Sequence, residues 1–308
     1  MRNRLLMLLA ALALLVVAAA PAQAITNGEP DNGEHPMVGE LLLYIPDDVD
    51  PRFNDPGTWY TCSGTLLDAD TVVTAGHCTY GVGRNGTSTT AGGGSGSGGN
   101  DVWISFSEAP DFDILPPSST FAPDHNADRY QAWSAALNAS PEWHHATAIP
   151  HPQYDPDAFF LHDAGVLQLL EPAPMNQYGR LPSLALLDTL AKDKSQTFTA
   201  VGYGLELSGP HTALGGDTRR KAEVMLVNLN GVYGAGKGIA AKFSSNLGKP
   251  HTGGTCFGDS GGPIFQDDTT VVTAVTSFGI SETCRDGGGA YRLDQPDDLG
   301  FIAPFVSP

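Results

Sequence analysis

The chain has 308 residues and a formal net charge of −18, with 41% hydrophobic but only 16% charged residues. Such an acidic chain repels nucleic acids and anionic membrane surfaces, and we expect neither as a partner. Its 37 glycines and 23 prolines, together with short runs rich in Thr, Val and Tyr, favour an all-β protein over a helical one.

Residues 1–24 have the organisation of a secretory signal peptide. Two arginines precede a continuous apolar run at 5–20, which a proline ends, and an Ala-Gln-Ala cleavage site follows at 22–24. The run is shorter than the roughly 20 apolar residues that span a bilayer. We therefore expect export, cleavage after Ala24 and a secreted, extracellular protein of residues 25–308 with no membrane anchor.

Short strands separated by turns predict a sandwich or barrel architecture. Residues 87–99 are almost entirely Gly, Ser and Thr and predict a mobile loop, which we place within one domain because a strand candidate follows at once. Helix candidates are few, at 130–137 and 184–192. The strand candidates lie at residues 37–45, 60–67, 71–75, 102–106, 146–149, 165–170, 197–201, 223–229, 263–266, 271–278 and 290–293.

The four cysteines favour two disulfides in an exported chain. They are Cys62, Cys78, Cys256 and Cys284. Three pairings are possible from the count alone. No C-x-x-C pair is present, and the neighbouring His144 and His145 are poorly placed to converge on one ion, so we expect no metal and no cofactor.

The sharpest chemical signal is Gly-Asp-Ser-Gly-Gly-Pro at residues 258–263. Glycines on both sides of Ser260 allow a tight turn that exposes its hydroxyl. The backbone N–H groups of Gly258 and Ser260 are then candidates for an oxyanion hole. A serine hydroxyl attacks only when a base removes its proton, so this motif predicts a partner histidine.

That histidine is predicted by Val-Thr-Ala-Gly-His-Cys at residues 73–78. His77 directly follows a strand candidate, and a disulfide at Cys78 would fix the backbone that carries it. Histidine suits the role of general base because it accepts and returns a proton near neutral pH.

A carboxylate at the start of an apolar strand completes the set. Asp163 precedes the strand candidate 165–170, where an acid is costly unless it is paired. Accepting a hydrogen bond from His77 would pair it and fix the imidazole tautomer. Asp155 and Asp157 are rivals, but their proline-containing turn favours solvated side chains.

In the order His77, Asp163 and Ser260, these motifs resemble the trypsin/chymotrypsin-like serine peptidase family, over nearly all of residues 25–306. The alternative hydrolase pattern G-x-S-x-G is absent around Ser260. Further segments that resemble the family lie at residues 25–28, 62–66, 149–154, 201–204, 276–279 and 289–291.

The resemblance implies two packed six-stranded antiparallel β-barrels with the catalytic cleft between them, the first at about 25–180 and the second at about 181–308. It also implies the bridges Cys62–Cys78 and Cys256–Cys284. Two features depart from the family: the long separation of the histidine and aspartate motifs, and a C-terminal helix that we expect to be short or absent.

By resemblance, Gly254 forms the base of the primary substrate pocket. Its walls are Ser277, Gly279 and Gly289. An open, uncharged slot favours large apolar or aromatic residues at P1, the position before the scissile bond. Two acids on an adjacent loop could reach in and change that preference: Glu282 and Asp286.

The family is activated when a new α-amino group pairs with the acid before the nucleophile. Here the matching residues are Ile25 and Asp259. Because the predicted signal cleavage exposes Ile25 directly, we expect an enzyme that is active on export, without a zymogen stage.

Taken together, the sequence predicts a secreted, monomeric serine endopeptidase that cleaves peptide or protein substrates through an acyl-enzyme intermediate. The main alternative is a catalytically inert trypsin-like fold that acts as a binding module. An esterase with the same nucleophile is a second alternative.

Overall fold

The structure is a computed structural model. It describes residues 25–46, 58–83, 98–122, 126–193, 195–209, 212–230, 232–244, 252–279, 283–284 and 287–307. The expected signal peptide, most of the Gly/Ser segment at 87–99, and both Glu282 and Asp286 lie outside the described residues.

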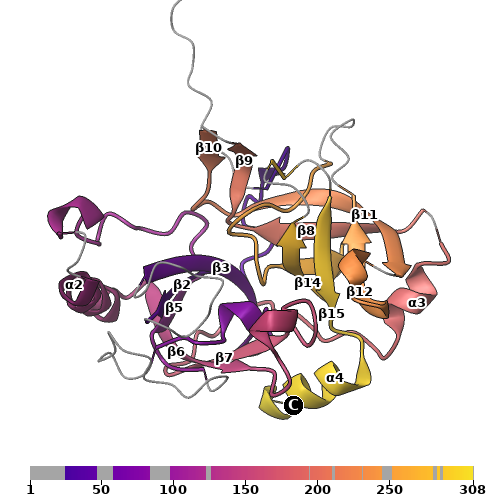
Figure 1. The fold of residues 1–308 in the computed structure, drawn as a ribbon, viewed down its shortest axis with the longest axis horizontal. Helices are drawn as coiled ribbons and strands as arrows, with labels where there is room; N and C mark the ends of the chain where they lie inside the picture. The colour runs from indigo at the N-terminus through magenta and orange to yellow at the C-terminus, as the bar shows by residue number, and fades with distance from the viewer. Residues whose placement is uncertain are drawn as a thin grey trace, which may run out of the picture.

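Six antiparallel strands close the first barrel in the order β2–β3–β4–β7–β6–β5 (Figure 1). The turn between β3 and β4 is held by the Asp68 carboxylate, which accepts the N–H groups of Asp70 and Thr71 at 3.1 and 2.8 Å. Every strand predicted for this half is present. The strands are β2 (Val38–Ile45), β3 (Thr58–Leu66), β4 (Thr71–Thr74), β5 (Val102–Ser105), β6 (Trp143–Pro150) and β7 (Gly165–Leu169).

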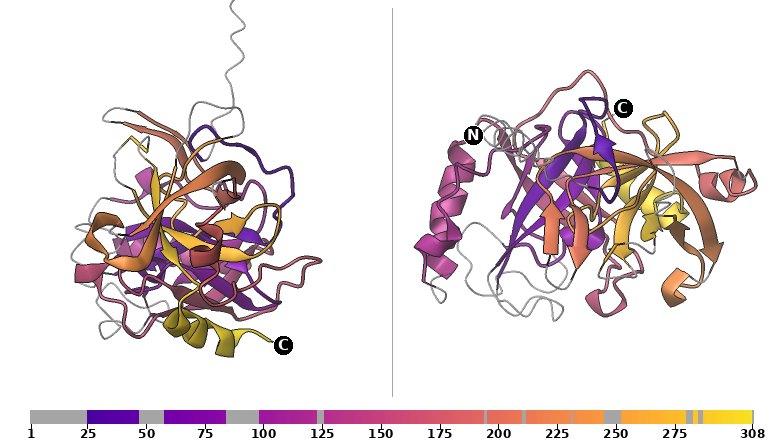
Figure 2. Two further views of the ribbon diagram at one scale, coloured as in Figure 1. Left: turned by 90° about the vertical axis from the view of Figure 1, so that its right-hand side faces the viewer. Right: turned by 90° about the horizontal axis from the view of Figure 1, so that it is seen from above.

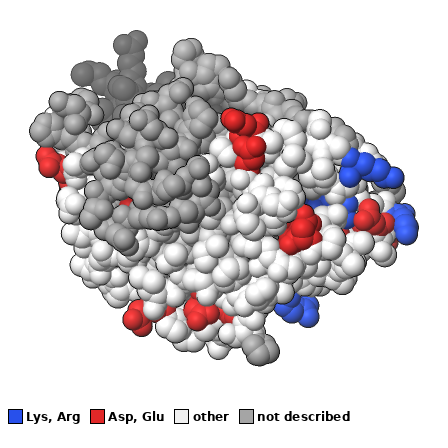
Figure 3. Space-filling model, turned by 60° about the horizontal axis from the view of Figure 1, so that its bottom comes forward, with Lys and Arg blue, Asp and Glu red and all other residues white. Residues whose placement is uncertain are grey.

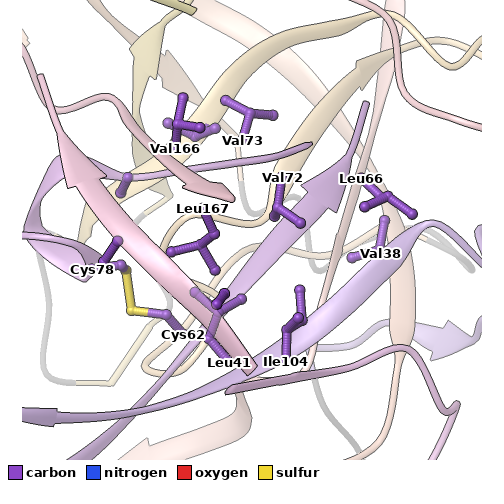
Figure 4. Packing of buried hydrophobic residues seen from close by; sticks show 14 of the residues in the cluster. Val38, Leu41, Cys62, Leu66, Val72, Val73, Cys78, Ile104, Val166 and Leu167 are labelled. Atoms are coloured by element: carbon purple, nitrogen blue, oxygen red, sulfur yellow. A yellow bond between two sulfur atoms is a disulfide. The ribbon is translucent and has the colours of Figure 1, made fainter. Parts of the chain in front are cut away.

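Branched aliphatic side chains from all parts of this barrel meet at its centre (Figure 4). Leu41, Val72 and Leu167 are fully buried there. Burying one such side chain contributes roughly 1.5–3 kcal/mol. The barrel therefore provides a rigid support for the residue that follows β4 and for the residue that precedes β7.

The second barrel closes in the order β8–β11–β12–β15–β14–β13, and β13 pairs back with β8. The prediction of two six-stranded antiparallel barrels is therefore confirmed. The sequence analysis missed β12, which pairs with β15 through Ala240 and Tyr291. The strands are β8 (Thr197–Gly202), β11 (Arg220–Asn230), β12 (Lys237–Phe243), β13 (Pro263–Gln266), β14 (Val272–Gly279) and β15 (Gly288–Arg292).

The two ends of the described chain tie the barrels together. Near the N-terminal end, β1 (Glu29–Pro30) pairs with β11 of the second barrel. At the other end, α4 (Pro296–Ile302) and η5 (Ala303–Phe305) lie at the bottom of the molecule in Figure 1, below β15. The Thr71 hydroxyl of the first barrel donates to the Phe305 carbonyl at 2.9 Å. A C-terminal helix is therefore present, but it is only 7 residues long.

An insertion between β5 and β6 adds a helix on the side of the first barrel away from the second (Figure 2, right). This helix, α2 (Asn126–Ala139), is longer than the predicted one. It packs over aromatic side chains that include Trp59, Trp103 and Trp143.

A separate two-stranded hairpin, β9 with β10, rises beside the second barrel (Figure 1). The remaining elements are short. Their bounds are β9 (Leu205–Gly209), β10 (Thr212–Gly215), α3 (Leu186–Leu190), η1 (Gly76–Cys78), η2 (Ser118–Thr120), η3 (Pro156–Ala158) and η4 (Val232–Gly234).

Acidic side chains are scattered over the face seen in Figure 3 rather than gathered into one patch. This distribution fits a solvated acidic surface on that face. Among the described residues, no helix has the length and apolar character needed to cross a membrane.

Candidate active site

The histidine and aspartate segments approach so closely that glycine is required on both. β4 leads into η1, which carries His77. A Cβ atom at Gly76 would lie 2.9 Å from the Tyr154 ring. A Cβ atom at Gly165 would lie 2.5 Å from the Thr79 hydroxyl. The glycine beside each motif residue therefore allows the two backbones to pack together.

His77 and Asp163 form a hydrogen-bonded pair. The imidazole Nδ1 of His77 lies 3.0 Å from Oδ2 and 3.1 Å from Oδ1 of Asp163. The backbone N–H of His77 donates to the same carboxylate at 2.8 Å. The Ser277 hydroxyl also donates to Asp163, which is fully buried. Three donors thus satisfy an acid that would otherwise be expensive to bury.

Ser277 has a contact that sequence reasoning missed. It was predicted as a wall of the substrate pocket, and its hydrogen bond to Asp163 is an additional role. The sequence could not indicate this role, because 114 residues separate the two side chains and only the fold brings them into contact.

The loop that carries Ser260 is anchored to the first barrel by Ser63. The Ser63 N–H donates to the Ser260 carbonyl at 2.7 Å, and its hydroxyl donates to the Gly258 carbonyl at 3.1 Å. A Cβ atom at Gly261 would lie 2.0 Å from the Thr74 hydroxyl. The glycine after the nucleophile therefore lets this loop reach across the interface between the barrels.

The two predicted oxyanion donors lie on the same turn. Gly258 has a φ of 98°, which favours glycine. Within the described residues, neither the Gly258 nor the Ser260 N–H donates to another protein group. Both N–H groups remain available to an oxygen atom in the adjoining cavity.

Asp259 is fully buried and accepts hydrogen bonds from two backbone N–H groups, those of Gly204 and Cys256, both at 2.8 Å. Burial raises the pKa of Asp259 to about 7, although the two hydrogen bonds oppose the rise. The described residues give this acid no cationic partner.

Ile25 is also fully buried, next to a strand-like contact between Thr26 and Gly254. Thr26 and Gly254 exchange N–H···O bonds of 2.9 and 3.0 Å. In the full chain Ile25 carries a peptide nitrogen rather than an α-amino group. Among the described contacts, none joins Ile25 to Asp259.

Two cavities adjoin the turn that carries Ser260, and both are lined by Ser260 and Phe257. The smaller one, about 150 Å³, includes Ser277 and Gly279 in its lining. The larger one, about 510 Å³, also contains His77. Phe257 is 53% exposed, so an aromatic side chain stands at the boundary between the two cavities.

Two of the four residues predicted for the substrate pocket, Gly254 and Gly289, are absent from the described lining of the smaller cavity. The Phe278 ring lies against Gly289, and a Cβ atom there would be 2.2 Å from it. The glycine at this position therefore makes room for a ring of the protein itself.

Among the residues that the structure describes, two groups of side chains come close enough to share a metal ion, and neither has a ligand set that fits one. In the first, Cys62 and Cys78 are joined in a disulfide. In the second, His151, His162 and Asp297 approach within 4.8 Å of one another. The Gln153 N–H donates to His151 Nδ1 at 3.1 Å, which leaves the proton of the neutral ring on Nε2. That tautomer has no lone pair to offer at Nε2.

Both predicted disulfides are present. Cys62 is bonded to Cys78 and Cys256 to Cys284, which confirms the pairing that the family resemblance implied. The first fixes the backbone beside His77, and the second fixes the segment before Ser260.

A family model for trypsin matches residues 125–295, more than half of the chain. The chain therefore belongs to the trypsin family. The matched segment contains Asp163 and Ser260 and begins after His77.

Solved structures with the same fold include one that is named as a collagenase and one that is named as an inactivated protease paralogue. An HL collagenase superposes with a TM-score of 0.61 at 17% identity, covering 92% of this chain and 100% of the collagenase. An inactivated protease paralogue of the scabies mite, S-D1, superposes with a TM-score of 0.59 at 15% identity and the same coverage. At these identities the likeness establishes the fold alone.

Proposed function

We propose that this chain is a serine endopeptidase. Ser260 attacks the peptide carbonyl, His77 takes the hydroxyl proton and returns it to the leaving amine, and Asp163 holds the imidazole. The N–H groups of Gly258 and Ser260 stabilise the oxyanion. The observation that carries the proposal is the His77–Asp163 hydrogen bond of 3.0 Å at the edge of a cavity that Ser260 also lines.

Three further parts of the proposal follow from the sequence. The signal at residues 1–24 sends the protein out of the cell, which suits a chain with two disulfides. Removal of that signal exposes Ile25, whose ammonium pairs with Asp259 and activates the enzyme. The preferred P1 residue is apolar or aromatic, since no described residue that lines the smaller cavity carries a charge.

The test is Ser260→Ala, compared with Ser183→Ala, a change of the same size at an exposed serine. We expect Ser260→Ala to lower kcat by roughly 10⁴–10⁶-fold with an unchanged unfolding midpoint, and Ser183→Ala to leave both unchanged. Near-normal turnover in Ser260→Ala would contradict the proposed mechanism.

Covalent labelling separates an active enzyme from an inert binding module. The inert alternative is considered because the mite paralogue with this fold is named as an inactivated protease. A fluorophosphonate probe should modify the wild type at Ser260 and leave Ser260→Ala unmodified. A wild-type chain that is folded but unlabelled would favour the inert alternative. Parallel assays on peptide and ester substrates then separate a peptidase from an esterase.

A further inference from the structure

The larger cavity beside Ser260 lies on the leaving-group side of the proposed reaction. The smaller cavity holds the P1 side chain in the proposed function. The residues after the scissile bond, P1′ and P2′, must then extend toward the larger cavity. His77 lines only that cavity, as expected for the group that gives its proton to the leaving amine.

This cavity, which we call the acidic recess, has an apolar wall and a single carboxylate. Leu43, Ile45 and Trp59 from the first barrel form part of the wall. Asp217 is the only acid among the described residues that line the recess, and its side chain is exposed. A ligand there therefore meets apolar surface first and one negative charge beyond it.

The backbone holds Asp217 at the recess in an unusual conformation. Gly215, Gly216 and Asp217 have φ values of 82°, 110° and 58°. Aspartate and asparagine tolerate such positive values better than other residues with a side chain. The Asp217 N–H donates to the Tyr203 carbonyl at 3.0 Å, which ties this turn to the second barrel.

A second, buried carboxyl lies directly behind the first. Glu40 interrupts the apolar strand β2, is 1% exposed, and lies close enough to Asp217 for each carboxyl group to shift the pKa of the other. Burial raises the pKa of Glu40 well above its ordinary value, and the nearby acids add to the rise. Burial also raises the pKa of Asp217, although the interaction with Glu40 opposes the rise. Because Glu40 is buried whereas Asp217 is exposed, the negative charge is favoured on Asp217, at the surface of the recess.

The nearby guanidinium group of Arg219 is bound to groups other than Asp217. Arg219 follows two residues later, but its guanidinium donates to Asp31 and to the Val38 and Phe106 carbonyls. Glu40 Oε2 is buried and has no hydrogen-bond partner among the described residues. The described lining of the recess therefore contains the Asp217 carboxylate and no lysine or arginine to compensate its charge.

We propose that the acidic recess binds a lysine or arginine side chain at P1′ or P2′, with Asp217 as the residue that selects it. The methylene stem lies along Leu43, Ile45 and Trp59, and the cationic end reaches the Asp217 carboxylate. This assignment rests on the proposed peptidase function and adds the substrate class that its leaving-group side accepts. The preferred substrates are peptides with a basic residue just after the scissile bond.

Quenched fluorescent peptides test the assignment. They share one sequence before the scissile bond and carry lysine, norleucine or glutamate at P1′ or P2′. We expect wild type to cleave the best lysine peptide with a kcat/KM roughly 10-fold or more above its norleucine counterpart, as a charge-assisted hydrogen bond allows. Asp217→Asn, which tolerates the same φ, should bring that ratio to within about 2-fold, chiefly by lowering the rate for the lysine peptide.

Glu171→Gln is the matched control, since it removes one negative charge from an exposed position outside the recess. It should keep the wild-type preference. Equal rates for lysine and norleucine in wild type would overturn the assignment, as would a lysine preference that survives Asp217→Asn.

A binding measurement keeps this result separate from the proposed function. If wild type neither cleaves peptides nor reacts with a fluorophosphonate, the peptidase proposal fails. Binding to the recess is then measured by fluorescence anisotropy, with the labelled peptides added to Ser260→Ala and to the double variant that also carries Asp217→Asn. Tighter binding of the lysine peptide that is lost with Asp217→Asn supports the recess, and equal binding of lysine and norleucine peptides rejects it.

Discussion

Two groups of charged side chains, each built around a buried acid, share two segments of the chain and have opposite surroundings. In the first, Asp31 is fully buried between two basic side chains, with His35 Nδ1 at 2.5 Å and Arg219 Nε at 2.9 Å. In the second, Glu40 lies nine residues further along and contacts Asp217, which precedes Arg219 by two residues. The charge of Asp259 also raises the pKa of Glu40.

The pKa values of the acids record this difference. Burial alone would raise the pKa of Asp31, but the hydrogen bonds and charges of His35 and Arg219 lower it to about 2. Burial raises the pKa of Glu40 well above its ordinary value and that of Asp259 to about 7. The lowered pKa of Asp31 indicates that the first group favours the folded state, whereas the second holds Glu40 and Asp259 in surroundings that disfavour their charge, as functional sites often do.

The largest effect on stability is expected from Arg219→Met, which removes one of the two basic partners of Asp31 in the first group. The variant leaves Asp31 with one fewer partner and removes a donor from each of the Val38 and Phe106 carbonyls. We expect the free energy of unfolding to fall by about 3–5 kcal/mol, measured by denaturant titration at pH 7. Arg180→Met, at an exposed arginine, should change it by less than about 0.5 kcal/mol.

The pH dependence of Arg219→Met adds a second readout. Asp31 has a folded pKa below its reference value of 3.8, so it stabilises the wild type above pH 3.8, and this contribution is lost as the pH falls through about 2. The variant should show a smaller loss on the acid side. Stability within 1 kcal/mol of wild type at pH 7 would mean that this group is not an anchor of the fold.

A somewhat smaller effect is expected at Asp259, and it depends on the chain's first residue. Its folded pKa of about 7 is above the reference of 3.8. The contribution of Asp259 to stability is therefore fully present below pH 3.8 and is lost as the pH rises through 7, by about 4 kcal/mol at most. A free ammonium at Ile25 would compensate the ionised acid and remove this loss.

Two inactive Ser260→Ala proteins, one beginning at Ile25 and one retaining Ala24, make the comparison direct. From pH 4 to pH 8, urea unfolding should show a declining contribution from Asp259 only in the longer protein. Identical pH profiles for the two proteins would reject the proposed pairing of Ile25 with Asp259.

Local sequence patterns predicted most of the strands and the active-site motifs because both are short-range. The short runs of β-branched, aliphatic and aromatic residues between turns indicate the strands of the first barrel by themselves, and the residues around His77 and Ser260 form complete motifs. β12 was missed because its sequence, Lys-Gly-Ile-Ala-Ala-Lys-Phe, has few branched residues, and its partner β15 is distant in the chain. It is a strand because the barrel requires it, not because its own residues favour one.

The unpredicted parts of the site arise from packing between distant segments. No pattern in the sequence brings the Phe278 ring against Gly289, or the Ser63 hydroxyl against Gly258. Glu40 is different, because an acid within the apolar strand Val38–Ile45 is itself a signal. A buried carboxyl there needs a partner or a proton, and this signal could have directed attention to the neighbourhood of Asp217.

The smallest effect is expected from Glu40→Gln, and it shows which member of the second group holds the charge. If Glu40 is the protonated carboxyl, glutamine has the same shape and charge and can still donate a hydrogen bond to Asp217. The free energy of unfolding should then change by less than about 1 kcal/mol, and the lysine preference of the recess should stay within about 2-fold of wild type. Removing a carboxylate at Asp217 abolishes that preference, whereas removing one at Glu40 should not. Both quantities can be measured with the urea titrations and quenched peptides described above. A loss of lysine preference as large as that of Asp217→Asn would place the negative charge on Glu40 instead. The second group would then be a buried anion rather than a buried proton donor behind an exposed one.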